Sequence, residues 1–195
     1  MRRAVLVRYV LVGLLAFVVI RSGVAPRLPV LRARAATMLT PSGEVTNIRV
    51  PAVGIDSRVI EVRQVKREGR MEWQVADYAV GHHAESGVPG GGTNIVLSGH
   101  NNINGEVFRR LDELKRGDIV ELETRSGASH RYEVKRTRLV LEDGASRQDR
   151  LRNARYMKRT ATERLTLISC WPYKPWPPYR IIVIAEPVEP ALAPT

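Results

Sequence analysis

The chain has 195 residues, of which 44% are hydrophobic and 26% are charged, and its formal net charge is +11. This balance excludes a mainly disordered protein, and the length allows one domain with an appendage. The single cysteine excludes an internal disulfide. The positive charge fits an anionic partner, and it fits equally well a bias toward arginine without a specific partner. No aromatic-interleaved basic cluster and no zinc-ligand spacing supports nucleic acid, so no nucleic-acid partner is expected.

Residues 1–21 are predicted to form a signal anchor. Basic residues at the start precede an apolar run from Tyr9 to Ile20, which is the pattern of a targeting segment. The run is short for a spanning helix, but Arg8 could reach the membrane interface. A cleaved signal is the alternative, and the lack of a small-residue cleavage site directly after Ile20 favours a retained membrane helix. Residues 22–44 hold three prolines among scattered arginines and are predicted to be a stalk.

The folded domain is predicted to span residues 45–187, followed by a loose, proline-containing tail over 188–195. Residues 78–93 are rich in glycine and proline and are predicted to be a long loop that carries His82 and His83 near the surface. Adjacent residues of an extended chain point to opposite sides, so these two histidines are not expected to share a metal.

Short strands separated by turns dominate the rest of the domain. Phe108, Leu111 and Leu114 would share one face of a short helix over 106–114, and a turn or two of helix is predicted over 148–154. The predicted strands before the C-terminal pair cover residues 47–51, 58–62, 71–75, 96–100, 119–123, 131–135 and 139–141. Many short strands with little helix suggest a closed β-barrel.

Residues 165–170 alternate in a β-branched and aliphatic pattern and predict a strand that ends in Cys170. The following segment, 171–179, contains four prolines, which exclude a helix or a central strand and predict a loop. A second strand follows over 180–185 and begins with Arg180. If the two strands pair as neighbours, the thiol and the guanidinium lie at the same end of the sheet.

Three predicted strands therefore end or begin with a chemically able side chain: His100, Cys170 and Arg180. A lone cysteine is more often a small buried hydrophobic residue, and an arginine at a strand start is usually a solvated charge. A histidine beside a cysteine, however, is a known way to make the thiol nucleophilic. An arginine can stabilise the oxyanion that forms when a thiolate attacks a carbonyl.

The segment 166–170 (TLISC) resembles the TLxTC motif of the sortases, the cysteine transpeptidases of bacterial cell surfaces. Residues 97–100 (LSGH) are similar to their strand-end histidine motif, and 180–183 (RIIV) to their arginine strand. The order of histidine, cysteine and arginine also fits. Ser169 stands where the family usually has threonine. The resemblance covers roughly residues 48–186. It is to enzymes of the class D, E or F type, and the sequence leaves the class open.

The resemblance implies an all-β domain, a closed eight-stranded barrel with one or two short helices. It implies a thiol enzyme in which Cys170 attacks an LPxTG-like sorting signal between threonine and glycine and forms a thioacyl intermediate. Arg180 would stabilise the oxyanion, and His100 would protonate the departing amine and deprotonate the incoming one. Ser98, Thr166 and Ser169, beside these residues, are candidates for contacting the peptide.

The implied partners are the sorting-signal peptide of a secreted surface protein and an amine acceptor, either a wall precursor or a pilin lysine. Neither a metal nor an organic cofactor is expected. In sortases of this plan the N-terminus lies inside the cell, so the protein would be a single-pass protein of the cell membrane with its catalytic domain outside.

Two alternatives fit the residues less well. Other surface enzymes with cysteine and histidine differ in pattern: L,D-transpeptidases place arginine soon after the cysteine, and papain-like peptidases place the cysteine before the histidine. The second alternative is a non-catalytic, membrane-anchored β-domain that binds an anionic surface polymer, with Cys170 merely buried. It explains the charge but leaves the three strand-end residues as coincidence.

Overall fold

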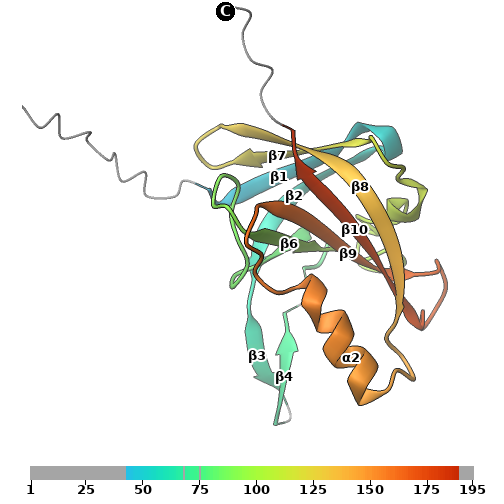
Figure 1. The fold of residues 1–195 in the computed structure, drawn as a ribbon. Coiled ribbons are helices and arrows are strands. Elements are labelled where there is room, and N and C mark those ends of the chain that lie inside the picture. The colour runs from blue at the N-terminus through green and yellow to red at the C-terminus, as the bar shows by residue number, and fades with distance from the viewer. Residues whose placement is uncertain (1–42, 68, 75, 189–195) are drawn as a thin grey trace, which may run out of the picture. The chain divides into compact units, whose positions relative to one another are not determined.

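The computed structural model describes residues 43–188, apart from 68 and 75 (Figure 1). The predicted signal anchor (1–21), nearly all of the predicted stalk and nearly all of the predicted tail lie outside these residues. Within the described part, no helix is long and apolar enough to cross a membrane.

The predicted all-β barrel is confirmed, and eight strands of the described residues close it. These strands are β1 (Val45–Val50), β2 (Ile55–Val62), β5 (Val80–His83), β6 (Asn94–Ser98), β7 (Ile119–Thr124), β8 (Ser129–Leu141), β9 (Arg164–Trp171) and β10 (Tyr179–Pro187). Their order around the barrel is β1–β2–β5–β6–β9–β10–β8–β7, and β7 closes it by pairing with β1 (Figure 1). The pairs β2–β5 and β6–β9 are parallel, whereas the other neighbours are antiparallel.

Short elements connect the strands of the barrel. They are the hairpin of β3 (Gln64–Arg67) and β4 (Arg70–Trp73), the 3₁₀ turns η1 (Pro51–Val53), η2 (Leu111–Glu113) and η3 (Ala154–Tyr156), and the helix α2 (Arg147–Asn153). The helix predicted around residues 148–154 is therefore present. Ser146 precedes the helix as its N-cap, and its side chain accepts a hydrogen bond from the Asp149 N–H.

The helix predicted over residues 106–114 is wrong, because only the short turn η2 forms there. Asn104, Gly105 and Glu106 all have positive φ angles, so the segment enters by a tight turn that cannot nucleate an α-helix. The apolar spacing that predicted the helix nevertheless identified core residues, because Phe108, Leu111 and Leu114 are all buried.

The long loop predicted over residues 78–93 is wrong in its first part, which forms strand β5. His82 and His83 are only 7% and 5% exposed, so they are not surface histidines. The prediction counted Gly81 as a sign of a loop, whereas this glycine allows close packing within a strand. A Cβ atom at this position would stand 2.9 Å from a methyl group of Val62, and no side chain fits there.

Two apolar layers lie on the two sides of the β9–β10 wall. Leu165 and Leu167 of β9 point into the barrel and belong to its main core. On the outer side, Ile182 and Ile184 pack against Tyr156 of η3. The connection that contains α2 and η3 therefore covers part of the outer face of the wall, where it flanks the end that holds Cys170.

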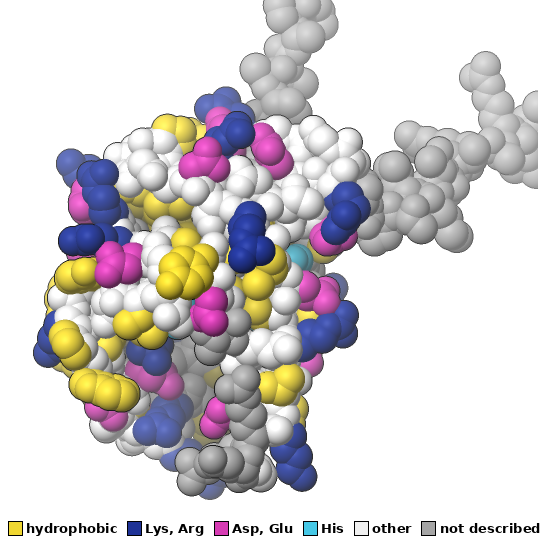
Figure 2. Space-filling view, turned by 180° about the vertical axis from the view of Figure 1, so that it is seen from behind, with side chains coloured by type: hydrophobic (Ala, Val, Ile, Leu, Met, Phe, Trp, Pro, Cys, Tyr) yellow, Lys and Arg dark blue, Asp and Glu magenta, His cyan; other side chains and the backbone are white. Residues whose placement is uncertain are grey.

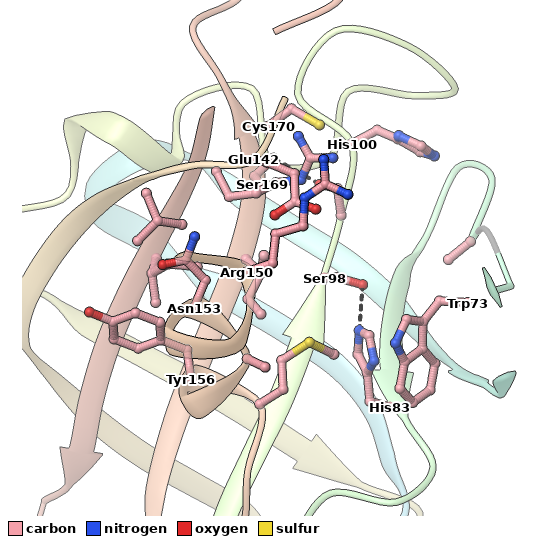
Figure 3. A pocket seen from close by; sticks show the side chains of 18 of the residues that line it. Trp73, His83, Ser98, His100, Glu142, Arg150, Asn153, Tyr156, Ser169 and Cys170 are labelled. Atoms are coloured by element: carbon pink, nitrogen blue, oxygen red, sulfur yellow. Dashed lines mark hydrogen bonds between the residues drawn. The ribbon is translucent and has the colours of Figure 1, made fainter. Parts of the chain in front are cut away.

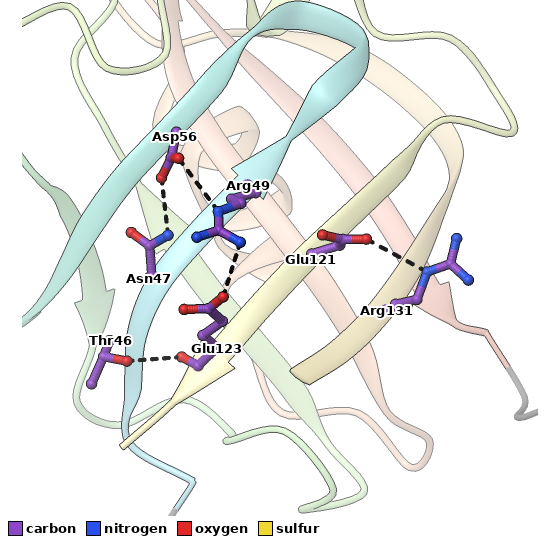
Figure 4. Close-up of polar contacts among 7 residues, drawn as sticks. All are labelled: Thr46, Asn47, Arg49, Asp56, Glu121, Glu123 and Arg131. Atoms are coloured by element: carbon purple, nitrogen blue, oxygen red, sulfur yellow. Dashed lines mark hydrogen bonds and ion pairs between the residues drawn. The ribbon is translucent and has the colours of Figure 1, made fainter. Parts of the chain in front are cut away.

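Ion pairs cover the opposite side of the barrel, over β1, β2, β7 and β8 (Figure 4). Arg49 pairs with Asp56 at 3.3 Å and with Glu123 at 3.1 Å, and Arg131 lies 3.7 Å from Glu121. Figure 2 shows acidic side chains beside basic ones across the face turned to the viewer. These pairs are exposed to solvent, so each contributes little to stability.

The side chain of Asn94 joins β6, β9 and the η3 segment. Its amide nitrogen donates to the carbonyl oxygens of Tyr156 (2.8 Å) and Lys158 (2.9 Å). Its amide oxygen accepts from the Thr166 hydroxyl (2.7 Å) and from Nε of Arg164 (3.1 Å). Asn94 is 0% exposed, so water cannot replace these four contacts.

We predict that Asn94→Ala lowers the free energy of unfolding by about 3 kcal/mol, since each buried polar group left unpaired costs about 1–3 kcal/mol. Urea denaturation of the full chain in a non-ionic detergent, followed by circular dichroism, measures the loss. Asn47→Ala is the matched control, because the Asn47 amide donates to Asp56 in an exposed position. It should cost less than about 0.5 kcal/mol. Equal losses in the two variants would contradict the role given to Asn94.

Candidate active site

The three side chains predicted from the sequence meet at one end of the β6–β9–β10 wall. Arg180 stands directly opposite Cys170 in the antiparallel pairing of β10 with β9. Strand β6 runs parallel to β9 with Ser98 beside Ile168, so His100, two residues later, reaches the level of Cys170. Figure 3 shows Cys170 and His100 at the same rim of a pocket. Its volume is about 480 Å³, and Arg180 also lines it.

Backbone contacts fix the segment that carries His100. The Gly99 N–H donates to the Ile168 carbonyl (3.1 Å), and the Phe108 N–H donates to the carbonyl of His100 (2.8 Å). Gly99 is needed at this point, because a Cβ atom there would lie 2.8 Å from a methyl carbon of Val107. His100 is therefore held on a short, tightly packed extension of β6, which suits a residue that must keep its place beside a thiol.

The electrostatics of the site favour a neutral imidazole and a fixed positive charge. Partial burial lowers the pKa of His100, and the carboxylate of Asp77 partly opposes this effect. At neutral pH the imidazole can therefore accept a proton, and once protonated it is a stronger acid than a free histidine. Arg180 donates to the Tyr179 carbonyl at 3.4 Å and has several further N–H donors to offer a ligand.

Cys170 is partly exposed rather than buried. Its side chain borders the first pocket and also a second groove of about 640 Å³, which extends under the β9–β10 loop. The lining of the second groove includes Asn102 and Ile103 and, from the β9–β10 loop, Trp176. His100 and Arg180 border both spaces, so the three residues stand where two grooves join.

The structure brings two of the three predicted peptide-contacting residues to the first pocket. Ser98 and Ser169 line it, and the Ser169 hydroxyl donates to the Gly99 carbonyl (2.8 Å), which ties β9 to the His100 segment. Thr166 is 0% exposed, and its hydroxyl donates to the amide oxygen of Asn94. Thr166 is not among the residues that line the pocket, so its role lies in the packing of β9 against β6.

A residue that the sequence did not point to, His83, lies at the inner end of the first pocket (Figure 3). Its Nε2 shares a hydrogen bond of 2.9 Å with the Ser98 hydroxyl. The Trp73 ring packs against the imidazole in an edge-to-face arrangement, with the two ring centres 4.2 Å apart. The signal that could have found it is the apolar pair Ala79 and Val80, which is typical of a strand and directly precedes the histidines.

Among the described residues, no group of three or more histidine, cysteine, aspartate or glutamate side chains is placed to hold a metal ion. His82 and His83 point to opposite sides of β5, because His82 Nε2 meets the Gly87 carbonyl (2.9 Å) whereas His83 meets Ser98. The two histidines therefore do not form a shared site.

The family model of the sortase domain matches residues 48–188. The chain belongs to the sortase family. It is 32% identical over 127 residues to Sortase D of Bacillus subtilis (strain 168), a match that covers 63% of this chain and 58% of that protein. The match thus spans little more than half the length of this curated relative.

Solved sortase structures share the fold. Sortase A from Corynebacterium diphtheriae, a lid mutant, superposes with a TM-score of 0.58 at 23% identity, over 77% of this chain and 72% of that one. A Clostridium perfringens Sortase D5 transpeptidase superposes with a TM-score of 0.55 at 22% identity, over 74% of this chain and 79% of that one. Sortases of different classes match about equally well, so the fold does not separate the classes.

The burial of His83 predicts a pH-dependent stability. Burial, assisted by the nearby His82, lowers the pKa of His83 to about 4, whereas in an unfolded chain the pKa of this histidine would be near its ordinary value of 6.5. Between these values the unfolded chain binds more protons, so stability falls as the pH drops from about 6.5 to about 4. We predict that His83→Gln flattens this fall by up to about 3 kcal/mol. Urea denaturation of both proteins at several pH values measures it, and parallel curves would contradict the prediction.

Proposed function

We propose that this sortase is a cysteine transpeptidase that cleaves an LPxTG-like sorting signal and joins the new carboxyl end to an amine. The observation that carries the proposal is the meeting of Cys170, His100 and Arg180 at the junction of two grooves. A substrate can lie along one groove and an acceptor along the other, with the thiol between them.

The reaction follows from the three side chains. His100 takes the proton of the Cys170 thiol, and the resulting thiolate attacks the scissile carbonyl carbon. The N–H groups of Arg180 stabilise the oxyanion of the tetrahedral intermediate. When the C–N bond breaks, His100 gives a proton to the departing amine, and a thioester remains on Cys170. An incoming amine then attacks the thioester and loses a proton to His100, and the thiolate leaves. Without an amine, water can take its place, which gives the hydrolysis of a thiol protease.

The walls of the two grooves support a division of roles between them. Ile168, Ile182 and Met157 give the first groove apolar walls, which suit the leucine and proline of a sorting signal. The second groove differs by the carboxylate of Asp143, whereas Glu142 and Arg150 line both grooves. A carboxylate there suits a positively charged amine such as a pilin lysine or a wall precursor. We assign the peptide to the first groove and the acceptor to the second.

The cellular setting is also part of the proposal. A basic start and the apolar run of Tyr9 to Ile20 support a single-pass membrane anchor. Arginines flank both ends of the run, so the charge does not set its orientation, and membership of the sortase family supports a catalytic domain outside the cell. The match to Sortase D of Bacillus subtilis supports an enzyme close to class D.

We predict that Cys170→Ala abolishes both cleavage and joining while the fold is kept, because no other side chain replaces the thiol. The full chain is incubated with a library of LxxTG peptides and several amines, and mass spectrometry identifies the products. Circular dichroism checks the fold of the variant. The wild-type products name the preferred signal and acceptor. Cleavage by the variant would show that the nucleophile is misassigned.

We predict that Arg180→Lys lowers kcat by about 10²–10³-fold, the usual loss for one oxyanion donor. A lysine keeps the charge but loses the planar, forked donor geometry. The alkylation rate of Cys170 should stay near that of the wild type, since the thiol itself is untouched. Lys174→Ala is the control, because its side chain is exposed in the β9–β10 loop and should be dispensable. Normal turnover in the first variant, or collapse in the second, would mean that the wrong basic residue was assigned.

A further inference from the structure

The outer face of β9 leads from the active site to a further pocket, which is distinct from the two grooves. Alternate residues of a strand share a face, so Arg164 lies on the side of the wall that carries Cys170, six residues away in the sequence and about 20 Å along the strand. This further pocket has a volume of about 410 Å³ and lies at the Arg164 end of β9. Its lining consists of Arg136, Arg138, Arg155, Tyr156, Thr160 and Arg164, and we call it the arginine pocket.

Four guanidinium groups line the arginine pocket, and none of them forms an ion pair with a carboxylate among residues 43–188. Glu163 is the nearest acidic residue in the sequence, but its carboxylate is already engaged. It accepts from the N–H groups of Gly90 (3.1 Å) and Gly92 (2.9 Å) and from the Tyr132 hydroxyl (2.7 Å). The pocket therefore gathers four positively charged side chains that no carboxylate among the described residues pairs with directly.

Hydrogen bonds hold two of the arginines in place. Nε of Arg164 donates to Asn94 (3.1 Å), and its Nη2 donates to the Tyr156 carbonyl (3.4 Å). Arg155 donates to the Tyr156 hydroxyl (3.0 Å) and lies over the ring of that residue, 4.9 Å from its centre. Side chains that are ordered before a ligand arrives lose less entropy when they bind it.

The arrangement is unfavourable for the protein alone. Burial and the neighbouring charge of Arg136 both lower the pKa of Arg164, which means that bringing these groups together costs free energy. A bound anion would offset this cost by pairing with several guanidinium groups at once. Like-charged groups gathered in a pocket are a common sign of a binding site.

We propose that the arginine pocket binds a phosphate-bearing ligand, either a diphosphate or a phosphodiester. Guanidinium groups form paired hydrogen bonds with phosphate oxygens. A diphosphate offers more charged acceptor oxygens than a carboxylate, and a phosphodiester offers the same number together with two ester oxygens, which suits several donors around one space. The site is separate from the proposed transpeptidase centre. It is also its neighbour, because Tyr156 lines both the arginine pocket and the first groove.

The test is isothermal titration of the full chain, in a non-ionic detergent, with inorganic pyrophosphate and in parallel with glycerophosphoglycerol, a soluble phosphodiester headgroup. The variant is R136Q/R138Q, since both side chains are exposed and neither contributes to the Asn94 contacts. The control is R49Q/R131Q, which removes the same amount of charge from the side of the barrel that carries the ion pairs (Figure 4).

We expect saturable binding of at least one probe, weakened at least tenfold in R136Q/R138Q and less than twofold in R49Q/R131Q. Tighter binding of pyrophosphate assigns a diphosphate, and tighter binding of glycerophosphoglycerol assigns a phosphodiester. Absence of saturable binding, or equal weakening in the two variants, would overturn the proposal. A glutamate-rich peptide that binds more tightly than both probes would also overturn it, in favour of an acidic protein partner. Because binding is measured without turnover, the result does not depend on the transpeptidase assignment.

Discussion

The parallel pairing of β6 with β9 is the constraint on which the site depends. Two parallel strands run toward the same edge of a sheet, so the residues that follow or end them are delivered to one place. Here that edge receives His100 from β6 and Cys170 from β9, and the antiparallel β10 returns with Arg180 opposite the cysteine. A slip of one residue in the β6–β9 pairing would turn His100 to the other face of the wall. The buried amide of Asn94 bridges these strands at the far end and opposes such a slip.

The part of the site that the sequence predicts best is the part encoded by local pattern. Alternation in 165–170, the four prolines after Cys170 and the apolar run from Arg180 indicate two neighbouring strands and place the thiol beside the guanidinium. Local pattern also shows which residues of β9 share a face. It cannot show that the outer face is covered, because the cover comes from Tyr156 in the connection that precedes β9, which folds back onto the wall. Thr166 was therefore expected at the peptide, whereas it packs beneath that connection.

Strand β5 is a strand that the local sequence argues against. Its residues 80–83 (VGHH) contain a glycine and two histidines, all of which weaken a strand prediction. The strand forms because β2 and β6 supply hydrogen-bonding partners on both sides, and because the missing side chain of Gly81 makes room for Val62. Both causes are long-range. The same holds for the arginine pocket, whose members come from β8, η3, the segment after it and β9 and have no common motif in the sequence.

The placement of the tryptophans gives the protein a built-in optical reporter. The chain contains three, and two of them line the grooves beside Cys170. Trp73 lines the first groove against His83, Trp176 lines the second and is 92% exposed, and Trp171 directly follows Cys170. Two of the three emitters therefore stand in the grooves, whereas Trp171 packs against the barrel core. The occupancy of each groove can be followed without a label, and replacing Trp73 or Trp176 by phenylalanine separates the signal of one groove from that of the other.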